Sequence, residues 1–197
     1  VKMKFGPAIA TIVGLASFAA VDSQSTVLGI VEFSPNHETL EAAVKAVPEI
    51  AGLLAIPNFN LTLFGPTDAA FSSLPNGTVS RLLEPEWNKH LESLLAYHAL
   101  NAEYSYEDVI SATADGPVSI QTLDGTNITL STVNGTVVLN DSVNVVAPDI
   151  NAINGVVHVV DGVLLPPSAT MNIVAMAQAN PVFSTLVGLA IDAGLVD

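Results

Sequence analysis

The stretch that decides the fold is Leu61-Thr-Leu-Phe-Gly-Pro-Thr-Asp-Ala-Ala-Phe-Ser-Ser-Leu-Pro75. Its first four residues form a short apolar run that is typical of a buried strand. Thr67 or Asp68 then offers an N-cap for a short helix ending near Leu74, because both side chains carry an oxygen that accepts from the first helical N–H groups. The stretch therefore predicts a strand that passes directly into a helix.

The chain on either side of this stretch divides into a helical half and a strand half. Apolar residues from Thr39 to Leu54 follow helical spacing, with Thr39 as the expected N-cap and a break or kink at Pro48. Further helices are expected at residues 85–98 and 106–111. Helical spacing of apolar residues and capping signals therefore place most of the predicted helices before residue 112.

After Pro117 the pattern changes to period two and short apolar runs. Asp124-Gly125 and Asn134-Gly135 are hairpin-turn signals between the first of these runs. More strands are expected at residues 143–146 and at 156–160, the last continuing to 165. Helices first and strands later predict an α+β domain with a mainly antiparallel sheet.

The N-terminus has the pattern of a secretory signal peptide, predicted at residues 1–22. Lys2 and Lys4 precede a charge-free run over residues 8–21 that ends in small residues. The run is short for a spanning helix, which needs about 20 apolar residues. A buried N-terminal helix is the alternative interpretation.

The C-terminal residues 170–197 repeat the beginning of the domain. Ile173-Val174 echoes Ile30-Val31, and Thr185-Leu186 echoes Thr39-Leu40. One helical opening cannot bury its own apolar face, because a repeat unit needs its neighbours. This segment is therefore predicted to be the start of a second, truncated domain of the same type.

Composition excludes several classes of protein. Half of the residues are apolar and 12% are charged, which excludes a disordered chain. The formal net charge of −14 repels phosphates and anionic lipids, so no nucleic-acid partner and no membrane insertion of the mature chain are expected. The absence of cysteine from the sequence excludes thiol catalysis and cysteine-ligated metals.

Five N-x-S/T sequons behind a signal peptide predict a secreted glycoprotein. The sequons begin at Asn60, Asn76, Asn127, Asn134 and Asn140. Several of them lie in threonine-rich strand or turn sequence, so we do not expect all five to be used.

Three segments resemble the signature segments of the fasciclin domain family. They are Leu61 to Pro75, Leu94-Leu-Ala-Tyr-His98 and Asn154-Gly-Val-Val-His-Val-Val-Asp-Gly-Val-Leu-Leu-Pro166. They occur in family order, and Gly65 stands where the family more often has alanine. The resemblance implies one complete fasciclin domain at residues 26–168: a wedge-shaped, mainly antiparallel β-sandwich with several helices packed around it. It also implies secretion or residence at the cell surface, and a role in cell adhesion or matrix assembly.

Asp149 and Ile150, in Pro148-Asp149-Ile150, are the first candidate partner-binding residues. The resemblance implies that such an Asp-Ile pair takes part in integrin recognition. An exposed aspartate can complete the coordination of a receptor-bound cation, and isoleucine can fill a neighbouring pocket. The alternative is a turn in which Asp149 caps the backbone and Ile150 belongs to the core.

Tyr97 and His98 are the second candidate pair, because the resemblance associates their segment with adhesion. The alternative is structural: the rings are buried near the end of an apolar helix, and their polar atoms are hydrogen-bonded. A structural role is also expected for five residues of the signature segments. These are Thr67, Asp68, Asn154, Gly155 and His158.

No enzymatic activity, cofactor or metal is predicted. The sequence has no nucleophile elbow, phosphate loop or dinucleotide fingerprint, and its four histidines lack zinc-ligand spacing. We expect an extracellular module that recognises an integrin-like receptor, a matrix component or a glycan, with self-association left open. The alternative is a binding module for a small apolar ligand between helices and sheet. A hydrolase using Asp68 or His98 is a distant third.

Overall fold

Two ranges of the chain, residues 25–75 and 77–166, are described by the computed structural model. The predicted signal peptide (1–22), Asn76 and the predicted partial second domain (170–197) lie outside the described residues. The predicted fasciclin domain (26–168) is therefore described almost to its expected end.

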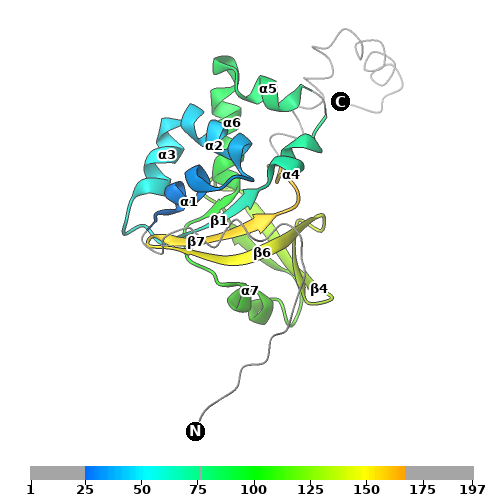
Figure 1. The fold of residues 1–197 in the computed structure, drawn as a ribbon. Helices are drawn as coiled ribbons and strands as arrows, with labels where there is room; N and C mark the ends of the chain where they lie inside the picture. The colour runs from blue at the N-terminus through cyan, green and yellow to red at the C-terminus, as the bar shows by residue number, and fades with distance from the viewer. Residues whose placement is uncertain (1–24, 76, 167–197) are drawn as a thin grey trace, which may run out of the picture.

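Helices come mostly before strands, as the sequence predicts. The helices are α1 (Val27–Phe33), α2 (Glu38–Ala46), α3 (Pro48–Ala55), α4 (Asp68–Ser72), α5 (Thr78–Leu82), the 3-10 helix η2 (Pro85–Trp87), α6 (Asn88–Tyr97) and α7 (Tyr106–Ala112). The strands are β1 (Leu61–Pro66), β2 (Ala99–Leu100), β3 (Val118–Gln121), β4 (Asn127–Val133), β5 (Thr136–Leu139), β6 (Val143–Ala152) and β7 (Gly155–Val160). Figure 1 shows α1 to α6 above β1 and β7, with α7 on the opposite side.

The seven strands form one sheet system in the order β2-β1-β7-β6-β5-β4-β3. Strands β1 and β7 are parallel, in a register that pairs Thr62 with Val156, and the other neighbours are antiparallel. The outermost strands meet, because Leu100 bridges Thr122 and the N–H of Leu123 donates to the carbonyl of Ala99 (2.8 Å). The sheet thus folds back on itself, which confirms the expected α+β sandwich.

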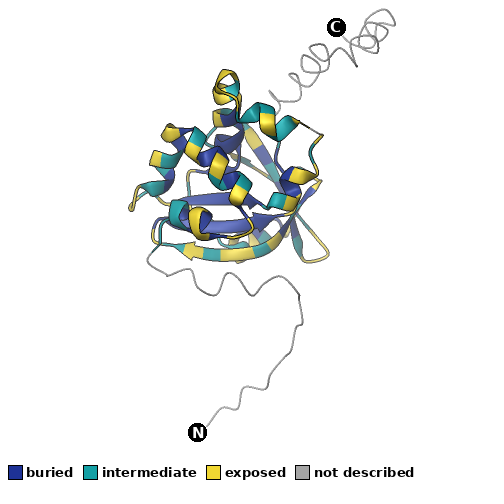
Figure 2. Ribbon diagram, turned by 45° about the horizontal axis from the view of Figure 1, so that its top comes forward, coloured by how far each residue is buried: buried dark blue, intermediate teal, exposed yellow. Residues whose placement is uncertain are grey.

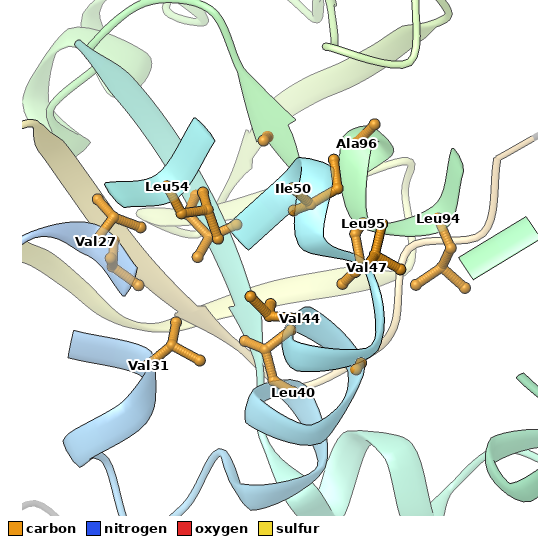
Figure 3. Close-up of a cluster of buried hydrophobic side chains, with 14 of the residues drawn as sticks. Val27, Val31, Leu40, Val44, Val47, Ile50, Leu54, Leu94, Leu95 and Ala96 are labelled. Carbon is orange, nitrogen blue, oxygen red and sulfur yellow. The ribbon is translucent and has the colours of Figure 1, made fainter. Parts of the chain in front are cut away.

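Two apolar clusters fill the two layers of the domain. The helix-side core lies between the helices and β1 and β7. Figure 3 shows side chains of this core gathered from α1, α2, α3 and α6. The sandwich core lies between the two halves of the sheet and contains Phe64, Tyr97, Leu100, Val109, Ile128, Leu130, Val137, Leu139, Val143, Val145, Val160 and Leu164.

Strand β7 separates the two cores and is buried along its whole length. Val157 belongs to the helix-side core and Val160 to the sandwich core. Figure 2 shows the same layering, with buried strands beneath helices whose outer faces are exposed. A strand between two cores is buried on both faces, which explains why β7 is apolar except for His158.

The structure corrects three local expectations. The break at Pro48 is confirmed, because it divides the helical stretch into α2 and α3, but Thr39 lies inside α2 and is not its N-cap. Strand β6 continues to Ala152 instead of ending near residue 146, and β7 ends at Val160 instead of continuing to residue 165. The extra length of β6 comes from its pairing with β7, and no local pattern in β6 indicates that it has this partner.

Candidate functional site

Strand β6 carries a β-bulge at Pro148-Asp149. The register to β7 runs from the pair Ala147 and Val159 to the pair Ile150 and Val157, so β6 has one extra residue there. Asp149 takes up the extra length with a φ of +56°, a left-handed conformation that aspartate tolerates better than most residues. The candidate Asp-Ile pair thus lies in an interrupted strand rather than in a turn.

Hydrogen bonds to other groups hold the bulge where the regular backbone pairing between β6 and β7 is interrupted. The N–H of Asp149 donates to Nδ1 of His158 (3.1 Å) on β7. Its Oδ1 accepts from the N–H of Tyr106 (2.8 Å), the first residue of α7. The Asp149 side chain is nevertheless 43% exposed, so its carboxylate remains accessible to solvent. Ile150, beside it, is half-buried and packs against the helix-side core.

His158 anchors this bulge from inside the domain. Its side chain is only 2% exposed, and Nε2 lies 2.9 Å from the carbonyl oxygen of Tyr104, to which it donates. The ring packs on Phe64, with 5.8 Å between the ring centroids. Burial lowers the pKa of His158, while the Tyr104 bond and the charge of Asp149 act in the opposite direction. The ring is therefore neutral near pH 7.

Tyr97 and His98 are buried in the core. The hydroxyl of Tyr97 donates to the carbonyl of Asn127 (3.1 Å) and accepts from Nδ2 of Asn140 (2.9 Å). Nδ1 of His98 donates to the carbonyl of Leu94 (2.8 Å), and Nε2 accepts from the N–H of Leu164 (2.9 Å). Burial lowers the pKa of His98 to about 4. This arrangement fits the packing alternative, and a partner cannot touch either ring unless the core opens.

Thr67 and Asp68 cap two different helices. Oγ1 of Thr67 accepts from the N–H of Ala70 (3.2 Å) and caps α4. The carboxylate of Asp68 accepts from the N–H groups of Thr39 (2.8 Å) and Glu38 (3.3 Å), and so caps α2. Partial burial favours the neutral acid, but these hydrogen bonds lower the pKa of Asp68 below its usual value.

Asn154 and Gly155 join the helices to the sheet. Nδ2 of Asn154 donates to the carbonyls of Leu54 (2.9 Å) and Ile56 (3.0 Å), and Oδ1 accepts from the N–H of Val27 (2.8 Å). Gly155 has a φ of +146°, and a Cβ there would lie 1.9 Å from the carbonyl oxygen of Leu61. Asn154 thus links α1 and the end of α3 to the sheet, and Gly155 allows the close approach of β7 to β1.

The sequons differ in how far their asparagines are engaged. Asn60, Asn127 and Asn134 are exposed. Asn140 is half-buried: its amide nitrogen donates to Tyr97, and its Oδ1 accepts from the N–H of Thr129 (3.0 Å). Glycosylation remains a prediction at each sequon, and Asn140 is the one whose amide already has a structural role.

Sequence reasoning missed Tyr106, which connects the bulge to a hairpin. Its N–H binds Asp149, and its hydroxyl donates to the carbonyl of Gly135 (2.9 Å) in the turn between β4 and β5. These contacts span 43 and 29 residues along the chain. No local pattern signals such separations, so only a three-dimensional arrangement reveals this residue.

Neither a metal cluster nor a membrane helix is found within residues 25–75 and 77–166. No group of three or more potential ligands among His, Cys, Asp and Glu is arranged to hold a metal ion there. No helix in the same ranges is long and apolar enough to cross a bilayer.

A model of the fasciclin domain matches residues 35–166. The chain belongs to the fasciclin domain family. It is 37% identical over 153 residues to Synechocystis protein sll1483, covering 78% of this chain and 80% of that protein. It is also 32% identical over 128 residues to human periostin, covering 65% of this chain but only 14% of periostin.

The fold agrees with a solved fasciclin structure. The match is to a FAS1 domain pair from the insect cell adhesion molecule fasciclin I, with a TM-score of 0.65 and 24% identity. It covers 73% of this chain and 52% of that chain. The resemblance drawn from the three signature segments is thus confirmed for family and fold.

Proposed function

We propose that this fasciclin chain is an extracellular adhesion or matrix-interaction module that works by surface recognition of a protein or glycan partner. The observation that carries the proposal is Asp149. It is an exposed acid held in a left-handed bulge by two hydrogen bonds from different elements. Backbone strain of this kind costs on the order of 1–3 kcal/mol and persists where the surroundings enforce it, often at binding sites.

The surroundings of Asp149 suit recognition better than catalysis. Its carboxylate is preorganised, so little side-chain freedom is lost when a partner binds. Val146, three residues earlier on β6, is 52% exposed and leaves apolar surface on the same strand. A carboxylate beside apolar surface matches a receptor-bound divalent cation or a basic group with an apolar rim.

Extracellular residence is part of the same proposal. It is supported by the predicted signal peptide at residues 1–22, by the exposed sequons and by membership of the fasciclin family. Ile150 supports the base of the bulge from the core side, whereas Tyr97 and His98 would act by shaping the core. Contact with the partner is assigned to Asp149 and its exposed neighbours.

Cell and matrix adhesion to the purified chain tests the proposal, with Asp149→Asn beside wild type. Asparagine keeps an oxygen for the Tyr106 N–H and tolerates a positive φ, but it has no charge. Loss of one partner of a hydrogen-bonded charge pair that becomes buried at an interface costs about 2–5 kcal/mol, so we expect adhesion to weaken by at least about tenfold.

Asp141→Asn is the matched control for this experiment. Asp141 is also exposed and also has a positive φ, of +57°, so the two variants make the same chemical change at equivalent backbone conformations. We expect Asp141→Asn to adhere like wild type. Equal adhesion by Asp149→Asn and wild type would remove Asp149 from the site. Failure of wild type to adhere to integrin-bearing cells, matrix proteins and glycans would refute the function itself.

A further inference from the structure

The contact between His158 and Asp149 depends on the protonation state of the imidazole. A neutral imidazole has one acceptor and one donor nitrogen, and both are used here. Nδ1 accepts from the N–H of Asp149 (3.1 Å), and Nε2 donates to the carbonyl of Tyr104 (2.9 Å). An imidazolium has two donors and no acceptor, so a second proton on His158 would abolish the bond that holds the backbone of Asp149.

The same proton would make Nδ1 of His158 a second donor for the carboxylate of Asp149, beside the N–H of Tyr106. Oδ1 lies 4.0 Å from Nδ1 of His158 and accepts from the N–H of Tyr106 at 2.8 Å. A charged Nδ1–H would repel the N–H of Asp149 and attract Oδ1. The carboxylate would then turn from its contact at the start of α7 toward the buried ring.

We propose that His158 is a positioning residue that holds the Asp149 carboxylate outward while its ring is neutral and withdraws it when the ring is protonated. The structural coupling stands on the contacts above, and its consequence for adhesion rests on the proposed function of Asp149. A partner would thus be held at neutral pH and released in a mildly acidic compartment.

Groups from three elements face the His158 ring and affect its protonation. From β1, the ring of Phe64 faces His158 and carries no charge. From the segment before α7, the carbonyl of Tyr104 binds Nε2. From β6, the carboxylate of Asp149 is the charged group that acts on the ring. Burial lowers the pKa of His158 below 6.5, so the rearrangement is expected on the acidic side of that value.

Nuclear magnetic resonance of the full chain tests the coupling without any partner. The ring nitrogens of His158 and the amide protons of Asp149 and Tyr106 are followed between about pH 8 and 5, above the range in which ordinary carboxyl groups titrate. We expect both amides to shift with the midpoint of the His158 ring. The amide of Thr129, bound to Asn140 elsewhere in the sheet, serves as the internal control and should not follow that midpoint.

Two variants separate the functions of the two ring nitrogens. His158→Asn places an amide oxygen near the position of Nδ1, so it can accept from Asp149 but cannot titrate. His158→Gln places an amide nitrogen near the position of Nε2, so it can bind Tyr104 but offers Asp149 no acceptor. We expect His158→Asn to keep the neutral-pH signals of Tyr106 down to pH 5. We expect His158→Gln to show displaced signals at every pH.

The proposal is overturned if the Tyr106 amide fails to follow the His158 ring in wild type. It is also overturned if the Thr129 amide shifts with the same midpoint, because the change would then be global acid unfolding. If both variants fail to fold, the wild-type midpoints alone decide. Adhesion is measured over the same pH range: adhesion by wild type that does not weaken with the His158 midpoint contradicts the consequence. Absence of adhesion at every pH contradicts only the proposed function.

Discussion

Asp149 and Gly155 have positive φ angles for different physical reasons. At Gly155 a Cβ would collide with the carbonyl of Leu61 in the neighbouring parallel strand, so only glycine fits. At Asp149 a side chain is allowed, and its oxygen makes the conformation useful by binding Tyr106. One residue is thus constrained by space, and the other is held by its partners.

Gly155→Ala should therefore destabilise the fold by more than about 3 kcal/mol, because a Cβ would lie 1.9 Å from a backbone oxygen that cannot move without displacing β1. Urea unfolding, with the midpoint and slope both fitted, measures the change. A free energy of unfolding within about 1 kcal/mol of wild type would show that the sheet can relax around this site.

Gly52→Ala is the control for that prediction. Gly52 lies in α3, is exposed, and has no atom within 4 Å of a Cβ built on it. Alanine has the higher helix propensity, so this variant should be more stable than wild type by about 0.5–1 kcal/mol. The same substitution thus has opposite signs at the two positions.

At the scale of elements, helix capping connects parts of the chain that lie far apart in sequence. The N-cap position of α2 is His37, whose side chain makes no capping bond. Asp68, about thirty residues further on in α4, supplies the acceptor instead. A single aspartate therefore connects the start of α2 to the strand-to-helix turn that follows β1.

Asp68→Ala should cost about 1 kcal/mol of stability at pH 7, the usual value of a helix cap. The hydrogen bonds lower the pKa of Asp68 in the folded state, so its contribution is present above the ordinary value of 3.8. It is lost as the pH falls through the lower folded-state pKa. Unfolding at about pH 7 and pH 3 should show the gap between variant and wild type closing in acid; a gap that stays constant would contradict a charge-assisted cap.

At the scale of the whole molecule, three buried histidines make polar contacts inside the domain. His37 contacts Ser34, with 2.7 Å between Nδ1 and Oγ; His98 joins α6 to Leu164; and His158 joins β7 to the bulge. Burial is the main cause that lowers the pKa of each of them. Each contributes to the fold as a neutral ring.

This makes the domain acid-sensitive. Above about pH 7.5 the three rings are neutral in both the folded and the unfolded chain, so their effect on stability is constant. As the pH falls below 6.5 the unfolded chain binds protons first, and stability is lost until each folded-state pKa is passed. For His98, whose pKa is about 4, the loss is on the order of 3 kcal/mol.

Urea unfolding between about pH 7 and 5 measures this loss, and the slope against pH gives the protons taken up on unfolding. We expect an uptake of about one proton from His98 near pH 5.5, with a further contribution from His37 and His158 because burial lowers their pKa values as well. Added salt serves as the control, because screening alters the repulsion among acidic surface residues much more than the desolvation of buried rings. A slope near zero would show that the rings are protonated equally in both states.

Several elements could be predicted from short segments because local contacts decide them. Residues 61–64 form β1 as their apolar run predicts, and Asn134 and Gly135 form the expected turn with φ angles of +52° and +79°. Ser105, by contrast, forms a capping box with Asp108 that starts α7, a local signal that sequence reasoning did not use. Periodicity, turn chemistry and three signature segments were sufficient for the family and the fold class.

The parts of the candidate site could not be found in this way. Asp149 meets Tyr106 and His158 across 43 and nine residues, and Asp68 caps a helix about thirty residues before it. Local propensity and apolar spacing act within a few residues and predict single elements, whereas the family was inferred from the three signature segments. Which side chain meets which distant backbone group depends on how the layers pack, because burial requires each polar atom to find whatever partner the fold brings near it.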